Sequence, residues 1–197
     1  NKGRVGNPFR GEFHDVCSPV GDGSLFVFSS NWVVQCLDIV TGKEKWETVR
    51  QPRARSAEHR MPSLSGMRYK KMSAPVIYRN KVFTASDEDD FYCFDASDGR
   101  LCWNTRFCVK GSKADNNPSD SRIGPFPSRP LCEKDIVCFG LPTEGLVAFC
   151  TETGNMKWYI RLREPVFWQP KLNGGSLIAT SGYWIYSIRM QRGTPQW

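Results

Sequence analysis

Short apolar runs separated by polar tips recur along the chain. The first run, Leu25–Phe28, is followed by the polar tripeptide Ser29–Asn31 and then by a second apolar run, Trp32–Leu37. Another pair of runs spans Lys81–Ala85 and Phe91–Phe94. Runs of this length, rich in Val, Phe and Tyr and bounded by turn residues, predict short antiparallel strands joined by hairpins.

A four-fold repeat organises these runs. A Gly-x-x-x-Trp motif occurs four times, and a proline precedes each copy. The motifs are Gly42–Trp46, Gly99–Trp103, Gly154–Trp158 and Gly193–Trp197, and the prolines are Pro19, Pro75, Pro130 and Pro170. The Pro-to-Trp separations are 27, 28, 28 and 27 residues. A separation held within one residue over four copies indicates that each copy is one structural unit.

The residues just before each tryptophan are typical of a tight turn. Asp38 and Asp95 precede the first two motif glycines by four residues. A carboxylate at this place can cap nearby backbone amides, and glycine adopts positive φ without steric cost. We therefore expect blade turns at Gly42, Gly99, Gly154 and Gly193, with Asp38 and Asp95 as the capping side chains.

Four strands per unit, the last carrying the tryptophan, predict an all-β fold of β-propeller blades. A four-stranded antiparallel unit of this size cannot bury both its faces alone, whereas radial stacking of such units buries them. We expect one domain over residues 1–197, with blades at about 13–50, 72–107, 126–163 and 166–197 and insertions at about 51–71 and 108–125. A bulky indole at one fixed place is expected to pack between neighbouring blades, which assigns this role to Trp46, Trp103, Trp158 and Trp197.

The segment from Phe26 to Trp46, with Cys36-Leu37-Asp38-Ile39-Val40-Thr41-Gly42 at its centre, resembles the pyrroloquinoline-quinone-like propeller repeat. The resemblance covers about residues 13–197 and is closer than that to WD40 repeats, whose Trp-Asp pair is absent. Cys150 and Arg189 depart from it, because they stand where the first two units have aspartate. We expect the last two turns to be looser for this reason.

Four units are fewer than the propellers of this family usually contain, so the resemblance implies an incomplete ring. Blades elsewhere in a longer polypeptide, another subunit, or closure of the four units on themselves would each cover the open ends. An uncovered terminal blade would present an unpaired edge, so the fold itself favours protein partners.

Most of the net charge lies in the first insertion. The chain carries +7 overall, and residues 47–72 contribute +5 of it. The basic residues form a predicted docking loop of Arg50, Arg53, Arg55, Arg60, Arg68, Lys70 and Lys71. An acidic protein surface is the preferred partner; nucleic acid and anionic lipid are alternatives, although Tyr69 is the segment's sole aromatic residue. The second insertion, Lys110–Arg122, is nearly neutral, and we assign it no chemistry.

The sequence has no apolar stretch as long as a membrane-spanning helix requires. The chain starts at Asn1 instead of methionine. We expect a processed product or an excerpt of a longer chain, and we favour an organelle protein imported after removal of its leader over a secreted or endoplasmic-reticulum protein.

The eight cysteines are even in number, which fits disulfides in a secreted protein, but most lie within apolar runs. Reduced cysteines in the core are therefore the preferred interpretation.

The search for catalytic residues yields no assignment of a catalytic, cofactor or metal residue. The chain lacks the adjacent cysteine pair found in some quinone-dependent dehydrogenases of this repeat family, and the family's calcium ligands have no matching motif here. Its two histidines, His14 and His59, lack a supporting pattern. The acidic run Asp87–Asp90 could attract calcium, but its place at a hairpin tip favours a solvated turn.

These observations predict a non-catalytic propeller scaffold or accessory subunit of a larger assembly, without a cofactor. Two alternatives stay open. The resemblance extends to the lumenal domains of unfolded-protein-sensing kinases, which implies a sensor or ligand-reading module. It also extends to quinone-dependent dehydrogenases, which implies a fragment of an enzyme.

Overall fold

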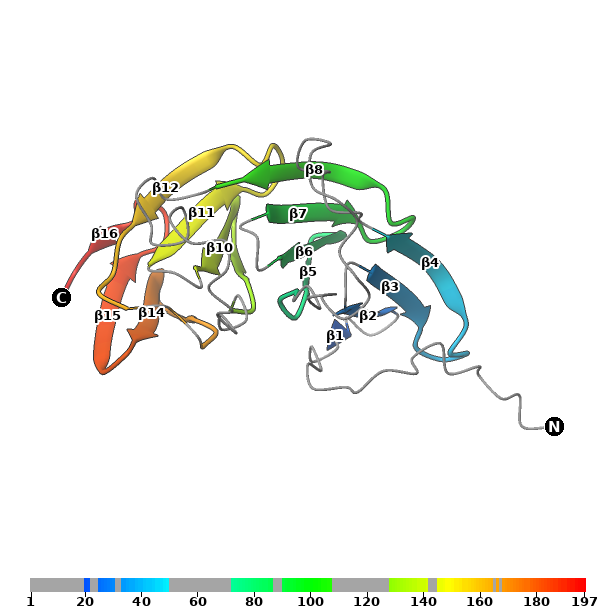
Figure 1. Ribbon diagram of the computed structural model, residues 1–197, viewed down its shortest axis with the longest axis horizontal. Coiled ribbons are helices and arrows are strands. Elements are labelled where there is room, and N and C mark those ends of the chain that lie inside the picture. The colour runs from blue at the N-terminus through cyan, green and yellow to red at the C-terminus, as the bar shows by residue number, and fades with distance from the viewer. Residues whose placement is uncertain are drawn as a thin grey trace, which may run out of the picture.

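The fold is described from a computed structural model of the chain (Figure 1). The structure describes residues 20–21, 25–30, 33–49, 72–86, 90–107, 128–141, 145–164, 166 and 168–197. Side chains are described from residue 33 onwards, with the exception of residue 49.

In the part of the chain that the structure describes, sixteen strands form four separate four-stranded sheets, each an antiparallel meander. Blade 1 contains β1 (Val20–Gly21), β2 (Leu25–Ser30), β3 (Val33–Asp38) and β4 (Glu44–Val49). Blade 2 contains β5 (Val76–Tyr78), β6 (Lys81–Ala85), β7 (Asp90–Asp95) and β8 (Leu101–Arg106). Blade 3 contains β9 (Leu131–Glu133), β10 (Ile136–Gly140), β11 (Leu146–Cys150) and β12 (Met156–Ile160). Blade 4 contains β13 (Lys171–Asn173), β14 (Ser176–Ser181), β15 (Trp184–Arg189) and β16 (Thr194–Pro195). The predicted all-β fold of propeller blades is confirmed.

The register of the outer strand pair is the same in the first three blades. Trp46 lies opposite Cys36, Trp103 opposite Cys93, and Trp158 opposite Ala148. A β-bulge follows directly in each pair. Because a bulge inserts one residue and increases the local twist, it sets the direction of the tryptophan side chain in the same way each time.

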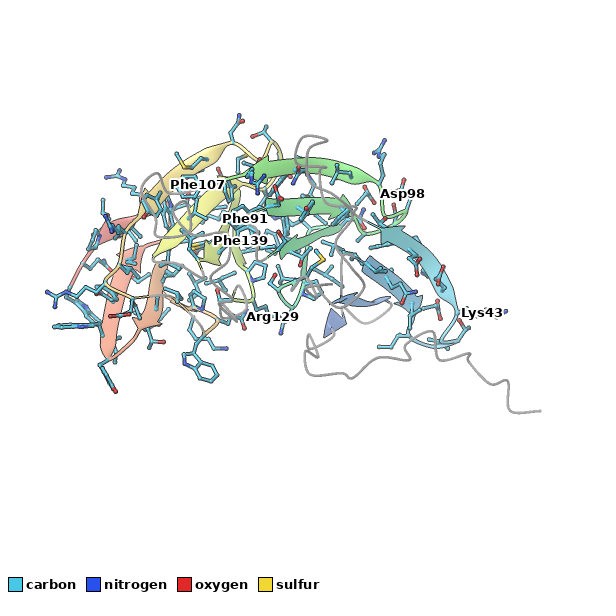
Figure 2. All side chains as sticks on the ribbon, viewed as in Figure 1. Lys43, Phe91, Asp98, Phe107, Arg129 and Phe139 are labelled. Carbon is cyan, nitrogen blue, oxygen red and sulfur yellow. The ribbon has the colours of Figure 1, made fainter. Side chains whose placement is uncertain are left out.

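The blades follow one another along an open arc that does not close into a ring (Figure 1). Among the side chains that the structure describes, three hydrophobic cores lie between successive blades, and none lies within a single blade. In the middle core, Phe91 of β7 meets Phe139 of β10 edge to face, with ring centroids 4.8 Å apart (Figure 2). The alternation of a strand's side chains therefore gives each inner blade two buried faces, one toward each neighbour.

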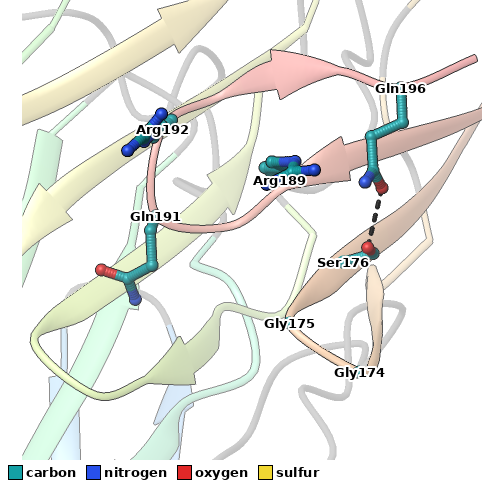
Figure 3. Close-up of a pocket in the computed structure, with 7 residues that line it drawn as sticks. All are labelled: Gly174, Gly175, Ser176, Arg189, Gln191, Arg192 and Gln196. Atoms are coloured by element: carbon teal, nitrogen blue, oxygen red, sulfur yellow. Dashed lines mark hydrogen bonds between the residues drawn. The ribbon is translucent and has the colours of Figure 1, made fainter.

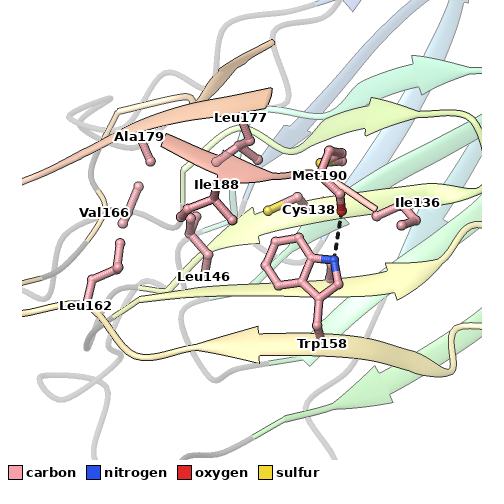
Figure 4. Close-up of a cluster of buried hydrophobic side chains, with 11 residues drawn as sticks. Ile136, Cys138, Leu146, Trp158, Leu162, Val166, Leu177, Ala179, Ile188 and Met190 are labelled. Atoms are coloured by element: carbon pink, nitrogen blue, oxygen red, sulfur yellow. Dashed lines mark hydrogen bonds between the residues drawn. The ribbon is translucent and has the colours of Figure 1, made fainter. Parts of the chain in front are cut away.

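A tryptophan and a glycine form the same joint at all three blade boundaries. The Trp46 indole N–H donates to the Ala96 carbonyl at 2.9 Å, and Trp103 donates to Thr151 at 2.9 Å. At the third boundary, Trp158 donates to the Met190 carbonyl at 2.8 Å beside a buried apolar cluster (Figure 4). Each indole thus packs in the core and also satisfies a backbone carbonyl of the next blade.

The motif glycine of the next blade lies under each of these indoles. A Cβ atom added to Gly99, Gly154 or Gly193 would lie 2.6–2.7 Å from a carbon of the preceding tryptophan ring. Each of these glycines also has positive φ, between 64° and 73°. Both the backbone conformation and the close approach of the ring therefore require glycine.

Each end of the described arc carries one of the two residues of the joint without the other: a tryptophan in blade 4 and a glycine in blade 1. Trp197 is 69% exposed, so among the described residues it does not pack between blades as the sequence predicts. At the other end, nothing lies within 4 Å of a Cβ added to Gly42. Ile39 is 49% exposed, although its counterparts in the later blades are buried.

The joint predicts unequal effects of two otherwise identical substitutions. Trp158→Ala should lower the free energy of unfolding by about 3–5 kcal/mol, because it leaves a cavity in the core and removes the bond to Met190. Trp197→Ala should change it by no more than about 0.5 kcal/mol, because that side chain is exposed. Urea denaturation of both variants measures the difference. Equal losses would show that the tryptophans do not hold the blades together.

Candidate interaction sites

Aspartate side chains cap the turns of blades 1 and 2. Asp38 accepts hydrogen bonds from the backbone N–H groups of Thr41 at 2.8 Å and Val40 at 3.1 Å, and from the Thr41 hydroxyl at 2.9 Å. These bonds, those from Thr41 above all, hold the pKa of Asp38 below its ordinary value. Asp95 accepts from the hydroxyl and N–H of Ser97, which lower its pKa in the same way.

The turns of blades 3 and 4 keep this backbone without an aspartate. The motif glycine N–H donates to the carbonyl four residues earlier in all four blades, at 2.8, 3.0, 2.9 and 2.8 Å. The prediction of looser turns at Cys150 and Arg189 is therefore wrong. The backbone bond and the positive φ of glycine hold the turn, whichever side chain stands at its first residue.

Cys150 takes the place of the capping aspartate in blade 3. Burial by itself raises the pKa of its thiol, but hydrogen bonds from the Thr153 side chain and from the backbone N–H groups of Thr153 and Glu152 lower it overall. Lys157 lowers the pKa further through its charge. The turn therefore favours a negatively charged acceptor at this position even when that acceptor is sulfur.

All six described cysteines are in the thiol form. Burial raises the pKa of the Cys132 thiol to about 12, and it also raises the pKa values of Cys93 and Cys138. Thiols with raised pKa values inside a core behave as small apolar side chains. Cys17 and Cys108 lie outside the described residues.

A group of exposed aromatic side chains lies where blade 3 passes into blade 4. We define the aromatic rim as Trp168 in the β12–β13 connection, Tyr183 and Trp184 in the β14–β15 hairpin, and Arg163. Trp168 is 74% exposed, Trp184 is 49% exposed, and Tyr183 is fully exposed. The Arg163 guanidinium lies over the Trp184 ring, 4.2 Å from its centroid.

The segments that carry the aromatic rim are bonded to each other. Ser181 is fully buried, and its hydroxyl accepts from the Glu164 N–H at 3.0 Å and donates to the Glu164 carbonyl. Gly182 lies close enough that an added Cβ would be 2.9 Å from the Glu164 side chain. The connection and the hairpin therefore form one supported surface.

The face of blade 4 that points away from blade 3 is more polar than the corresponding faces of blades 2 and 3. The β14–β15 register places Ile178, Thr180, Ile185 and Ser187 on it, together with Ser176. The corresponding residues of blade 3, Ile136, Cys138, Leu146 and Ala148, all lie in the core against blade 4. This outer face is thus suited to water or to a polar partner.

A pocket of about 370 Å³ opens at the turns of blade 4 (Figure 3). It is lined by Gly174, Gly175, Ser176, Arg189, Gln191, Arg192 and Gln196. Two of these seven residues are cationic and none is acidic, so the pocket attracts anions.

Other predicted residues lie outside the described part of the chain. They include the whole basic docking loop, Arg50, Arg53, Arg55, Arg60, Arg68, Lys70 and Lys71, and both histidines. Asp90 begins β7, but the other three residues of the acidic run are not described. Among the described residues, no three His, Cys, Asp or Glu side chains come together as a metal site.

Within the same ranges, no helix has the length and apolar character needed to cross a membrane.

The sequence pattern did not reveal the aromatic rim or the blade 4 pocket. One signal for the rim was available: three of the seven tryptophans lie outside the Gly-x-x-x-Trp motif, and two of these are Trp168 and Trp184. Their side chains have no repeated structural role, which makes their exposure informative.

Comparison with solved structures confirms the fold. BamB from Moraxella catarrhalis superposes with a TM-score of 0.61 at 19% identity, over 89% of this chain and 46% of that protein. Quinohemoprotein alcohol dehydrogenase from Comamonas testosteroni gives 0.69 at 14% identity, over 93% of this chain and 34% of that protein. The computationally designed Ika4 protein gives 0.63 at 10% identity, over 92% of this chain and 95% of the design. The chain thus spans about half of BamB and a third of the dehydrogenase.

Comparison with curated protein sequences gives no match. The family model described as outer membrane protein assembly factor BamB matches residues 5–104 and 62–138, which together exceed half of the chain. The solved structures share the arrangement of blades of this chain. The chain therefore belongs to the BamB-like family of pyrroloquinoline-quinone-like β-propeller repeats.

Proposed function

We propose that this chain is a non-catalytic interaction scaffold, an accessory subunit that binds other proteins of a larger assembly. The observation that carries the proposal is the aromatic rim, in which Trp168, Tyr183 and Trp184 are exposed on a connection and a hairpin that are bonded to each other, with Arg163 over the Trp184 ring. Tryptophan, tyrosine and arginine are the residues that dominate binding energy at protein interfaces.

The described strands on either side of the predicted basic docking loop meet that segment at the same end of the blades as the aromatic rim. The loop belongs to the connection from β4 to β5, and Trp168 belongs to the equivalent connection from β12 to β13. In a meander blade, the connection to the next blade and the hairpin between the second and third strands leave the sheet at one end. A partner with an acidic surface could therefore contact both features.

The family description supports an assembly role over an enzymatic one, because it names an outer membrane protein assembly factor. The likeness to quinohemoprotein alcohol dehydrogenase is at 14% identity and concerns the fold alone. Members of this fold thus include both scaffolds and enzymes, and the exposed aromatic rim favours the scaffold.

Removing the aromatic rim should release the partner. The double variant Tyr183→Ser and Trp184→Ser should weaken the complex at least about tenfold, because two exposed aromatic anchors are lost. The measurement is quantitative mass spectrometry of proteins that co-purify with the tagged chain from its native source. Met156→Ser is the control, because it removes an exposed apolar side chain of β12 that lies outside the rim and away from the open ends of the arc. A wild-type chain that purifies as a lone monomer, or a double variant that keeps its partners, would refute the scaffold.

Reversing the charge of the basic docking loop should slow association. The triple variant Arg53→Glu, Arg55→Glu and Arg60→Glu should lower the association rate of an acidic partner at least about tenfold at low salt, with a smaller effect at high salt. Surface plasmon resonance with the identified partner gives both rates.

The control for this test carries the same change of charge at exposed positions outside the loop. It is the triple variant Lys43→Glu, Arg100→Glu and Lys171→Glu. An association rate that falls equally in both triple variants would show a general charge effect and exclude the loop as the contact.

A further inference from the structure

In each blade the turn between the first and second strands lies beside the turn between the third and fourth strands. We call the place where these two turns meet the corner, and its backbone hydrogen bond is the same in blades 2, 3 and 4. In each of these blades, the residue that follows the position of Asp95 donates its N–H to a backbone carbonyl in the turn between the first two strands. The bonds are Ala96 to Asn80 at 2.9 Å, Thr151 to Asp135 at 2.9 Å, and Met190 to Gly175 at 3.1 Å. Side chains at this corner can therefore be compared position by position.

Acidic side chains occupy the corner in blades 2 and 3. In blade 2, Asp95 accepts from the Asn80 side-chain amide at 3.3 Å as well as from Ser97. In blade 3, Asp135 pairs with Lys157, whose ammonium lies 3.5 Å from its carboxylate. Each corner thus contains a carboxylate and at least one donor that faces it.

Blade 4 lacks both sources of the carboxylate. Arg189 stands at the position of Asp95, and Gly175 stands at the position of Asn80 and Asp135. The first replacement exchanges an anion for a cation, and the second removes a side chain altogether. The pocket of about 370 Å³ lies at this corner (Figure 3).

The donors that face the corner stay in place. Gln191 and Arg192 stand where Val40 and Thr41 of blade 1 give their N–H groups to Asp38. Among the described side chains of blade 4, none accepts from these two N–H groups. The Arg192 N–H donates to the Arg189 carbonyl at 3.2 Å, which leaves the Gln191 N–H for a ligand.

The Gln196 amide adds a further donor. Its carbonyl oxygen accepts from the hydroxyls of Ser176 at 2.7 Å and Ser187 at 2.8 Å. These two bonds orient the side chain and leave its NH₂ group for a ligand.

We propose that this corner of blade 4 is a binding site for a phosphate group. The pocket supplies two guanidinium groups, the Gln191 N–H and the Gln196 amide, with no acidic side chain among its lining residues. A phosphate monoester at neutral pH carries a charge close to −2, which balances Arg189 and Arg192, whereas a carboxylate would balance one of them. The site is separate from the aromatic rim and does not depend on the proposed scaffold function.

Amide NMR spectra of the full chain test the proposal. Titration with inorganic phosphate and with glycerol 3-phosphate at constant ionic strength should give saturable shifts at Gln191, Arg192 and Gly175. The tighter of the two probes shows whether the ligand is free phosphate or a phosphate ester.

Binding should weaken at pH 5, below the second pKa of about 6, where the ligand loses a charge. Shifts no larger than those from sodium chloride, or acetate binding as tight as phosphate, would overturn the assignment.

A single substitution should convert the corner back to the type found in blade 2. Arg189→Asp places a carboxylate where Asp95 stands, so it should weaken phosphate binding more than about tenfold while the chain stays folded. Lys171→Asp is the matched control, because it makes the same charge change at an exposed position of blade 4. Unfolding of Arg189→Asp would appear as loss of amide dispersion, and Arg192→Gln then provides the test. Equal phosphate affinity in the wild type and in a folded pocket variant would refute the site.

Discussion

The contact between a tryptophan ring and the glycine of the next blade is the constraint on which the rest of the structure depends. The cores formed by the described side chains each join two blades, so a blade must be placed against its neighbour before either buries its apolar face. The indole fixes that placement with packing and with one directed bond, as Trp158 does to the Met190 carbonyl. A Cβ on the glycine would enter the space that the ring occupies, so a larger residue at this position would push the indole out of its place.

A turn held by its backbone leaves its side chains open to change. Asp38, Asp95, Cys150 and Arg189 stand at one position of the same turn, and the glycine N–H bond beside them differs by 0.2 Å at most. The first three supply an acceptor to the turn amides, and Arg189 does not. New binding chemistry can therefore arise at a blade corner without cost to the blade-to-blade joint.

The period of the repeat was enough to predict the blades, because period-two strands and a fixed Trp–Gly spacing reflect local geometry. It was not enough to predict the exposure of the Trp197 side chain, because burial depends on a neighbouring blade that the local pattern does not describe. The aromatic rim joins segments brought together by the Glu164–Ser181 bonds. The blade 4 pocket needs the turn at Gly175 beside the turn that begins at Arg189, and the bond from the Met190 N–H to the Gly175 carbonyl holds these turns together. Such sites depend on which turns meet in space, and a repeat pattern treats all turns alike.

Blade 4 shows how one repeat can keep its joint and still acquire a different exterior. Toward blade 3 it presents Leu177, Ala179 and Ile188 to the shared core. Its opposite face carries Ser176, Thr180 and Ser187, and Ser176 and Ser187 bond to Gln196 instead of packing against apolar side chains. Since a strand alternates its side chains between two faces, the inward face can stay apolar while the outward face changes independently. The same alternation that builds the propeller therefore allows its fourth blade to carry polar binding groups on one side without weakening the core on the other.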